Sequence, residues 1–129
     1  MGTAQFSSSE EELEVNPSPQ RGCLYWVKSP SEPTEKRRPA LVVSVEARNR
    51  LANDVLVIPA STVLRPSPTH VRLRKGQGGL PRDSVLKCEQ ITILPKDLLS
   101  EQALGGPLSR KLMDEVERGV LRSIGVPVE

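Results

Sequence analysis

The stretch "EKRRPALVVS" (residues 35–44) runs from three consecutive bases through Pro39 into a continuous apolar segment. A short apolar run bounded by polar residues is typical of a buried β-strand. Proline at the first position of a strand removes no hydrogen bond from the ladder, so we predict a strand over 39–45. The bases at the mouth of this strand belong either to a solvated loop or to a binding site for an anion.

Further segments have the short apolar or alternating pattern of strands. We predict strands over 23–28, 55–59, 69–74 and 84–94, the last as one long bent strand or two short ones. The connections are too short for crossover helices, which favours a mostly antiparallel sheet curled into a small barrel or sandwich.

The end of the chain changes to helical spacing. Ser109 is a good N-cap, and Gly125 followed by Pro127 ends the pattern. The apolar stripe of this predicted helix, which we expect to pack on the sheet, comprises Leu112, Met113, Val116, Val120 and Ile124. The expected fold class is therefore mainly β (α+β) with a C-terminal helix.

Charge is distributed unevenly along the 129 residues, although the net charge is only +2. Residues 1–20 hold four of the 16 acids and none of the 18 bases, whereas residues 36–75 hold nine bases and two acids. Such a basic band suits a polyanion, of which nucleic acid is the commonest, or is ordinary surface charge. The candidate RNA-binding residues in this band are Lys36, Arg37, Arg65, His70, Arg72 and Arg74.

The N-terminal composition, the lack of membrane-spanning or secretion signals and the two cysteines indicate the kind of protein and where it is located. Residues 1–20 are rich in Ser, Glu and Pro, and we expect a flexible acidic leader, or else a segment that covers the basic band, ahead of a domain over 21–129. With no membrane-length apolar run and no secretion signal, we expect a cytoplasmic protein. Cys23 and Cys88 are too few and too far apart for a metal or redox site, so we expect reduced, packed thiols and no cofactor.

Five marks occur in a fixed order: "RGCLYWV", "RRPALVVS", Asn49, "VIPAST" and "GLPRDSVLKCEQI". With these marks the chain resembles the MazF/PemK (Kid) family of toxin endoribonucleases over about residues 21–124. The resemblance implies an SH3-like antiparallel barrel with a C-terminal helix, shared with the gyrase poison CcdB, and a homodimer. It also implies metal-independent cleavage of single-stranded RNA, and neutralisation by a MazE-like antitoxin with an acidic, disordered C-terminal segment.

The resemblance assigns roles to two further positions. An arginine directly before the strand-opening proline, here Arg38, lies in the family's active site, where its guanidinium meets the charge that builds on the phosphate. A hydroxyl two residues after the proline that ends the next strand is here Ser61, followed by Thr62, and either hydroxyl can donate to a phosphate oxygen. Alternatively, Ser61 bonds its own backbone in a turn.

The stretch "KCEQ" (87–90) matches an Arg-Cys-Asp-Gln stretch with catalytic groups in PemK-type relatives. We expect Lys87 and Glu89 to share one face of a strand, with the carboxylate as base and the cation as acid or clamp, and Gln90 beside the RNA. Without the resemblance, this pair is an exposed ion pair.

The first loop departs from the family. Many relatives carry a glutamate five residues before the key arginine, where this chain has Pro33. The flanking Glu32 or Glu35 can substitute for it, so the general base is Glu32, Glu35 or Glu89.

Two functional hypotheses follow. The first is an endoribonuclease toxin that cuts single-stranded RNA at short specific sequences by attack of the 2′-hydroxyl, leaving 2′,3′-cyclic phosphate and 5′-hydroxyl ends. The second is a weak or inactive relative that acts as a binding protein, or a CcdB-like topoisomerase poison. The ending "IGVPVE" lacks the Trp-Gly-Ile terminus of CcdB-like proteins, which argues against the poison. Of Tyr25 and Trp26, we expect at least one in the core, while either can stack on a base.

Overall fold

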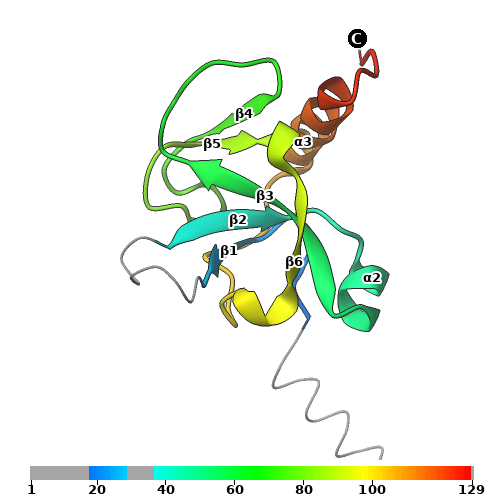
Figure 1. Ribbon diagram of the computed structural model, residues 1–129. Coiled ribbons are helices and arrows are strands. Elements are labelled where there is room, and N and C mark those ends of the chain that lie inside the picture. Colours follow the sequence, from blue (N-terminus) through cyan, green and yellow to red (C-terminus); the bar gives the residue numbers. More distant parts are fainter. Residues whose placement is uncertain (1–17, 29–36, 129) are drawn as a thin grey trace, which may run out of the picture.

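The computed structural model describes residues 18–28 and 37–128 (Figure 1). The predictions for Glu32, Glu35, Lys36 and the acidic stretch up to residue 17 lie outside the described residues. In chain order the elements are β1 (Leu24–Val27), β2 (Arg38–Val42), α2 (Glu46–Leu51), β3 (Asp54–Ser61), β4 (His70–Leu73), η2 (Gln77–Gly79), β5 (Ser84–Lys87), η3 (Cys88–Gln90), β6 (Thr92–Pro95), η4 (Lys96–Leu98) and α3 (Arg110–Ser123).

The strands form one sheet in the order β1-β2-β3-β5-β4, with β6 also paired to β3. Each of these pairings is antiparallel, which confirms the predicted mainly antiparallel sheet with a C-terminal helix. The long strand β3 is central: β2 lies along one edge, and β6 and then β5 lie along the other. Closure of this sheet into a barrel stays a prediction.

The segment 84–94 forms two short strands, the second of the two predicted alternatives. Between β5 and β6 the chain makes the 3₁₀ turn η3, and Cys88 in this turn is fully buried. The expectation that Lys87 and Glu89 share a strand face is wrong, because Lys87 ends β5 and Glu89 lies in the turn. A 3₁₀ turn rotates each successive side chain by about 120°, so residues two apart no longer point the same way.

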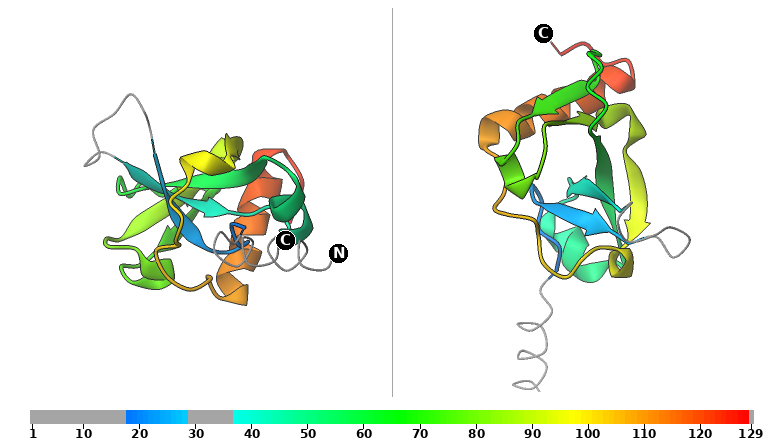
Figure 2. Two further views of the ribbon diagram at one scale, coloured as in Figure 1. Left: turned by 90° about the horizontal axis from the view of Figure 1, so that it is seen from below. Right: turned by 90° about the vertical axis from the view of Figure 1, so that its left-hand side faces the viewer.

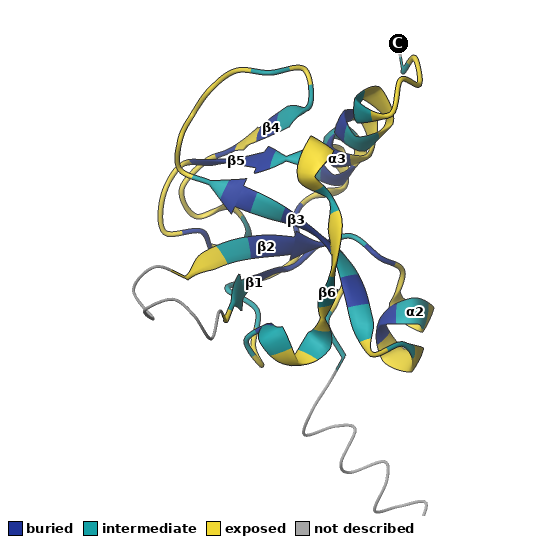
Figure 3. Cartoon of the chain, in the orientation of Figure 1, coloured by how far each residue is buried: buried dark blue, intermediate teal, exposed yellow. Residues whose placement is uncertain are grey.

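Two apolar clusters lie on the two faces of the sheet. One contains Leu41, Ile58 and Leu86 beneath α3, and the other contains Tyr25, Val42 and Val57. Tyr25 is therefore in the core, as predicted for one of the two aromatic residues, while Trp26 is half-buried. Figure 3 shows that β2 is exposed at its start and buried over its second half, and that burial alternates along most of β3.

Helix α3 confirms the predicted C-terminal helix. Ser109 Oγ accepts a hydrogen bond from the Leu112 N–H at 3.2 Å, and Gly125 has a φ of 86° just beyond the helix. The helix packs against β4 and η3 (Figure 2). A Cβ on Gly119 would lie 2.7 Å from Cys88 Sγ, so glycine allows the close approach that holds η3 in place.

Two details of the helices differ from the sequence-based expectation. Ile124 is 68% exposed and lies outside the apolar stripe, because it is the C-cap residue. Residues 46–51, for which no element was predicted, form the helix α2, and Val45 before it offers no side-chain cap.

Asn49 of α2 is fully buried, and its hydrogen bonds connect α2 to the sheet. Its Nδ2 donates to the Ser44 carbonyl at 2.9 Å, and its Oδ1 accepts from Ser44 Oγ at 2.5 Å. Ser44 Oγ also accepts from the Leu56 N–H at 3.0 Å. This network satisfies every polar group that it buries, so the Asn49 mark in the sequence has a structural role.

Within residues 18–28 and 37–128, no helix combines the length and the apolar content that crossing a bilayer requires.

Candidate functional site

The candidate site is built from one row of residues across the sheet. The paired residues of β2 and β3 end at Ala40 and Pro59, and two residues beyond them on the same side of the sheet lie Arg38, at the start of β2, and Ser61, at the end of β3. Residues directly opposite in antiparallel strands project from the same face, with Cβ atoms about 5 Å apart. The register therefore places the proposed cation and hydroxyl at neighbouring strand ends, and their joint role stays a prediction.

The row continues onto the next two strands. Ser61 pairs with Val85 of β5, and Val85 pairs with Arg72 of β4. Two residues further along β5, Lys87 pairs with His70. Because side chains alternate along a strand, Lys87 and His70 lie on the same face as Ser61 and Arg72. We call this set of Arg38, Ser61, His70, Arg72 and Lys87 the basic face.

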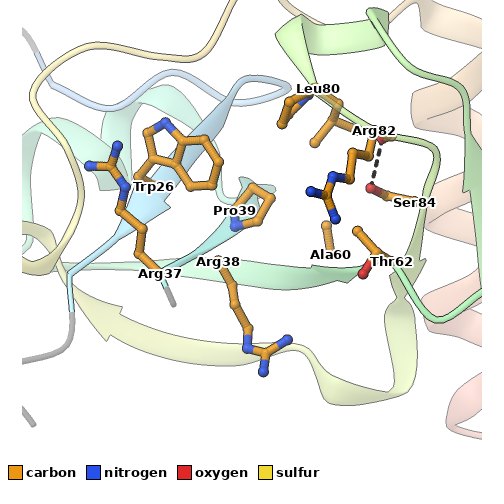
Figure 4. A pocket seen from close by; sticks show the side chains of 10 residues that line it. Trp26, Arg37, Arg38, Pro39, Ala60, Thr62, Leu80, Arg82 and Ser84 are labelled. Carbon is orange, nitrogen blue, oxygen red and sulfur yellow. Dashed lines mark hydrogen bonds between the residues drawn. The ribbon is translucent and has the colours of Figure 1, made fainter. Parts of the chain in front are cut away.

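Arg38 is exposed at the first position of β2, where it pairs with Val27 of β1. In the described part of the chain its guanidinium forms no hydrogen bond or ion pair. Figure 4 shows it extending away from the side chains of Trp26 and Arg82. An exposed guanidinium without an internal partner keeps all its donors for a ligand.

Ser61 sits at the last position of β3 and is half-buried. Its Oγ accepts a hydrogen bond from the Val63 N–H at 3.1 Å, so the turn predicted as the alternative for this residue is present. A hydroxyl that accepts one bond still has its own proton to donate. The two predicted roles are therefore compatible.

The Glu89 side chain, in η3, bonds to residues at the start of β4. Its Oε1 accepts from the Thr69 hydroxyl at 2.7 Å, and its Oε2 lies 3.2 Å from His70 Nε2. Partial burial raises the pKa of the Glu89 carboxyl, but the bonds from Thr69 and His70 contribute to a larger opposite effect, so the pKa lies below the usual glutamate value. The carboxylate is thus charged at neutral pH, and each of its oxygens has a neighbour.

His70 connects this carboxylate to the loop before β4. Its Nδ1 lies 3.0 Å from the Arg65 carbonyl oxygen, and its side chain is only 12% exposed. His70 is therefore held between η3 and the 62–69 loop, rather than standing free on the surface. The predicted Gln90 is exposed at the end of η3.

Arg72 is occupied by an acidic neighbour. Its NH2 atom lies 3.1 Å from Asp83 Oδ2. The backbone N–H of Lys75 that donates to Asp83, together with Arg72, holds the pKa of this carboxyl below its usual range. Arg74, just beyond β4, is exposed. A phosphate near Arg72 would compete with Asp83 for the guanidinium.

A hollow of about 550 Å³ lies mainly on the opposite side of β2 and β3, and Arg38 of the basic face borders it at the start of β2. Pro39 and Ala60, one residue along from Arg38 and Ser61, line it together with Thr62, so Thr62 is separated from the basic face. Arg82 reaches the same hollow from the loop before β5 (Figure 4). Arg82 and the hollow were missed from the sequence; their only signal was the stretch "GLPRDS".

The described residues offer little to a metal or to thiol chemistry. In residues 18–28 and 37–128, no cluster of three or more His, Cys, Asp or Glu side chains could hold a metal ion. Both cysteines are free and buried, as predicted. Burial and the neighbouring Glu89 raise the pKa of the Cys88 thiol to about 11, which leaves it protonated and unreactive at neutral pH.

Similar known proteins indicate the family of this chain. Residues 20–124 match the family described as PemK-like, MazF-like toxin of type II toxin-antitoxin system. Endoribonuclease MazF2 of Mycobacterium bovis and endoribonuclease MazF6 of Mycobacterium tuberculosis are each 38% identical over 109 residues, or 79% of this chain and 93% of theirs. Endoribonuclease MazF of Staphylococcus saprophyticus is 32% identical over 111 residues, or 82% of this chain and 91% of its own.

The solved structures give the same result for the fold. A mycobacterial endoribonuclease in complex with its cognate antitoxin has a TM-score of 0.71 at 27% identity, covering 87% of this chain and 100% of that one. The sheet with its C-terminal helix is therefore a MazF-like fold. The sequence resemblance is confirmed: this chain belongs to the PemK-like, MazF-like toxin family of type II toxin–antitoxin systems.

Proposed function

We propose that this protein is a toxin endoribonuclease that cleaves single-stranded RNA at short specific sequences, without a metal ion. The observation that carries the proposal is the alignment of Arg38 with Ser61 on an exposed face, in a chain of this family. A guanidinium and a hydroxyl side by side match two oxygens of one phosphate. The relatives at 32–38% identity that are named endoribonucleases support the same reaction class.

In the proposed reaction the RNA supplies its own nucleophile. The 2′-oxygen attacks the adjacent phosphorus and loses its proton, the bond from phosphorus to the 5′-oxygen breaks, and that oxygen gains a proton. The products are a 2′,3′-cyclic phosphate and a 5′-hydroxyl end. Negative charge gathers on the phosphorane oxygens between these events, and donors placed beforehand stabilise it most effectively.

Arg38 is the main electrostatic stabiliser in this scheme. A guanidinium stays charged at any working pH and presents a rigid fork, so it suits charge stabilisation better than proton transfer. Ser61 donates its hydroxyl proton to a second phosphate oxygen. Lys87, in the adjoining row, adds a cation that clamps the phosphate or gives a proton to the departing 5′-oxygen.

The acceptor of the 2′-hydroxyl proton is a carboxylate, and Glu32, Glu35 and Glu89 remain the alternatives. Glu89 is ionised at neutral pH, but its low pKa and its bonds to Thr69 and His70 make it a weak base. The Glu35→Gln and Glu89→Gln variants separate the alternatives. The variant in which the general base has been replaced should cleave RNA about 10²- to 10⁴-fold more slowly. If both variants keep full activity, the general base is Glu32.

The test of the activity is a cleavage assay with RNAs of varied sequence in excess EDTA. We expect fragments whose 5′ ends accept phosphate from a polynucleotide kinase without prior phosphatase treatment, because they carry free hydroxyls. RNAs that stay intact across many sequences would refute the endoribonuclease and favour the hypothesis of an inactive binding protein.

We also propose that a MazE-like antitoxin inhibits the protein with an acidic C-terminal segment, and that the toxin is a homodimer. The basic face supports the first part, because it offers several cations to such a segment. An acidic antitoxin peptide should displace labelled RNA in a competition assay. Simultaneous binding of peptide and RNA at full affinity would contradict this arrangement.

A further inference from the structure

The hollow on the far side of the basic face has the composition of a nucleotide site. Its floor is apolar, formed by Pro39, Ala60 and Leu80, and its volume is about 550 Å³. Small-molecule sites usually measure about 300–1,000 Å³ and combine such a floor with a few polar groups. The lining residues in the described part of the chain are Trp26, Arg37, Arg38, Pro39, Ala60, Thr62, Leu80, Pro81, Arg82 and Ser84.

The charged residues that line the hollow are arginines. Arginines at positions 37, 38 and 82 border the hollow, and none of the lining residues in ranges 18–28 and 37–128 carries a carboxylate. Arg82 is exposed, and its guanidinium projects between Pro39 and Thr62 (Figure 4). A hollow bordered by several cations attracts an anion.

Trp26 supplies an aromatic wall. Its ring lies beside the hollow, and the Arg37 guanidinium carbon is 4.8 Å from the ring centroid. An aromatic ring backed by guanidinium is a platform on which nucleobases stack, whatever their identity. Aromatic and cationic groups together therefore indicate a ligand with both a planar base and a phosphate.

Two hydroxyls complete the hollow. Ser84 Oγ donates to the Arg82 carbonyl at 3.0 Å and so fixes the backbone that carries Arg82. Thr62 is exposed, and in the described part of the chain its side chain forms no hydrogen bond. Thr62 can therefore bond to the edge of a base that lies in the hollow.

The hollow and the basic face meet at one end of the sheet. Arg38 and Pro39 are consecutive in β2, and Ser61 and Thr62 are consecutive at the end of β3. Alternation sends Arg38 and Ser61 to one face, and Pro39 and Thr62 to the other. An RNA strand that crosses these strand ends would place neighbouring nucleotides on opposite faces.

We propose that the hollow binds one unpaired base and its phosphate, from a nucleotide next to the one that is cleaved. The base lies against Trp26, Thr62 contacts its edge, and Arg82 holds the phosphate. This inference rests on the proposed function for its RNA ligand. An acidic peptide is the competing occupant, but the aromatic ring over an apolar floor favours a base.

The only tryptophan of the chain makes a direct test available, because Trp26 reports on its own site. The probe is a 2′-O-methyl RNA decamer of mixed sequence, which has no free 2′-hydroxyl and cannot be cleaved. We expect the single-stranded decamer to quench tryptophan fluorescence on binding, and the same decamer annealed to its complement to quench little.

Arg82→Ala keeps the fluorophore and removes the phosphate ligand. We expect its quenching titration to shift to about tenfold higher RNA concentration, since a hydrogen bond to a charged group is worth about that factor. The matched control is Arg118→Ala, an exposed arginine of α3 that loses the same charge and should shift by less than about twofold. Trp26→Ala, followed by anisotropy, should weaken binding about 5- to 150-fold. Trp26→Phe, which keeps a ring and the fold, should weaken it less.

Several results would overturn this assignment. These are RNA binding seen by anisotropy without quenching, equal shifts in Arg82→Ala and Arg118→Ala, or quenching by a poly-glutamate decamer but not by RNA. The last result would assign the hollow to a peptide. The two proposals fail separately: quenching without cleavage of unmodified RNA refutes the endoribonuclease only, and cleavage without quenching refutes the base site only.

Discussion

Removing the Ser61 hydroxyl isolates the smallest part of the proposed site. In Ser61→Ala the sheet stays intact, because the hydroxyl's only described bond is the one from the Val63 N–H, in an exposed turn. The variant loses one donor to a phosphate oxygen, and a hydrogen bond to a charged group contributes about 1.5–3 kcal/mol. If that bond forms fully only in the transition state, kcat/KM falls about 10- to 150-fold.

The assay is cleavage of a fluorescent RNA under kcat/KM conditions, with urea unfolding measured in parallel. Unfolding free energy should change by less than about 1 kcal/mol, because only a solvent-exposed bond is lost. Ser61→Thr, which restores the residue usual in the family, should cleave within a few-fold of the wild type. A fall of less than threefold in Ser61→Ala would refute the phosphate role and leave Ser61 as a turn residue.

Two further predictions concern charge and packing. Because the pKa of Glu89 is lowered in the folded protein, its stabilising effect is complete above its unfolded value of about 4.3 and disappears as the pH falls through the folded value. The Tm difference between wild type and Glu89→Gln should therefore shrink as the pH falls from 6 to about 3, and a constant difference would contradict this. Asn49→Ala should lower the unfolding free energy by about 3 kcal/mol, because it leaves buried Ser44 groups without partners. The exposed Asn53→Ala should cost less than about 0.5 kcal/mol, and equal losses in urea unfolding would refute the role of Asn49.

Most of the strand pattern was readable from the sequence because each strand has a simple period. Val71 and Leu73 are buried while Arg72 is exposed, as alternation requires. The helix α2 was not readable, because six residues are too short to show a 3.6-residue period and Val45 provides no capping signal. The turn η3 was missed for another reason: it exists because Cys88 is drawn under α3, a contact between distant parts of the chain.

The sequence predicts those parts of the candidate site whose positions depend only on strand register. Arg38 and Ser61 lie close to each other because the antiparallel register of β2 and β3, which pairs Ala40 with Pro59, brings the start of β2 beside the end of β3. The bonds of Glu89 to Thr69 and His70 depend on the fold of the 62–69 loop, which no local pattern specifies. The hollow around Arg82 combines residues from four separate segments, so it emerges only in three dimensions.

The most direct measurement of the central claim compares RNA cleavage rates, in EDTA, of the wild type, Arg38→Ala, Arg38→Lys and the surface control Arg118→Ala. Loss of one preorganised donor at the phosphorane should slow Arg38→Ala about 10²- to 10³-fold. Arg38→Lys, with charge but no fork, should fall between, and Arg118→Ala should match the wild type. Cleavage by Arg38→Ala at the wild-type rate would contradict the account.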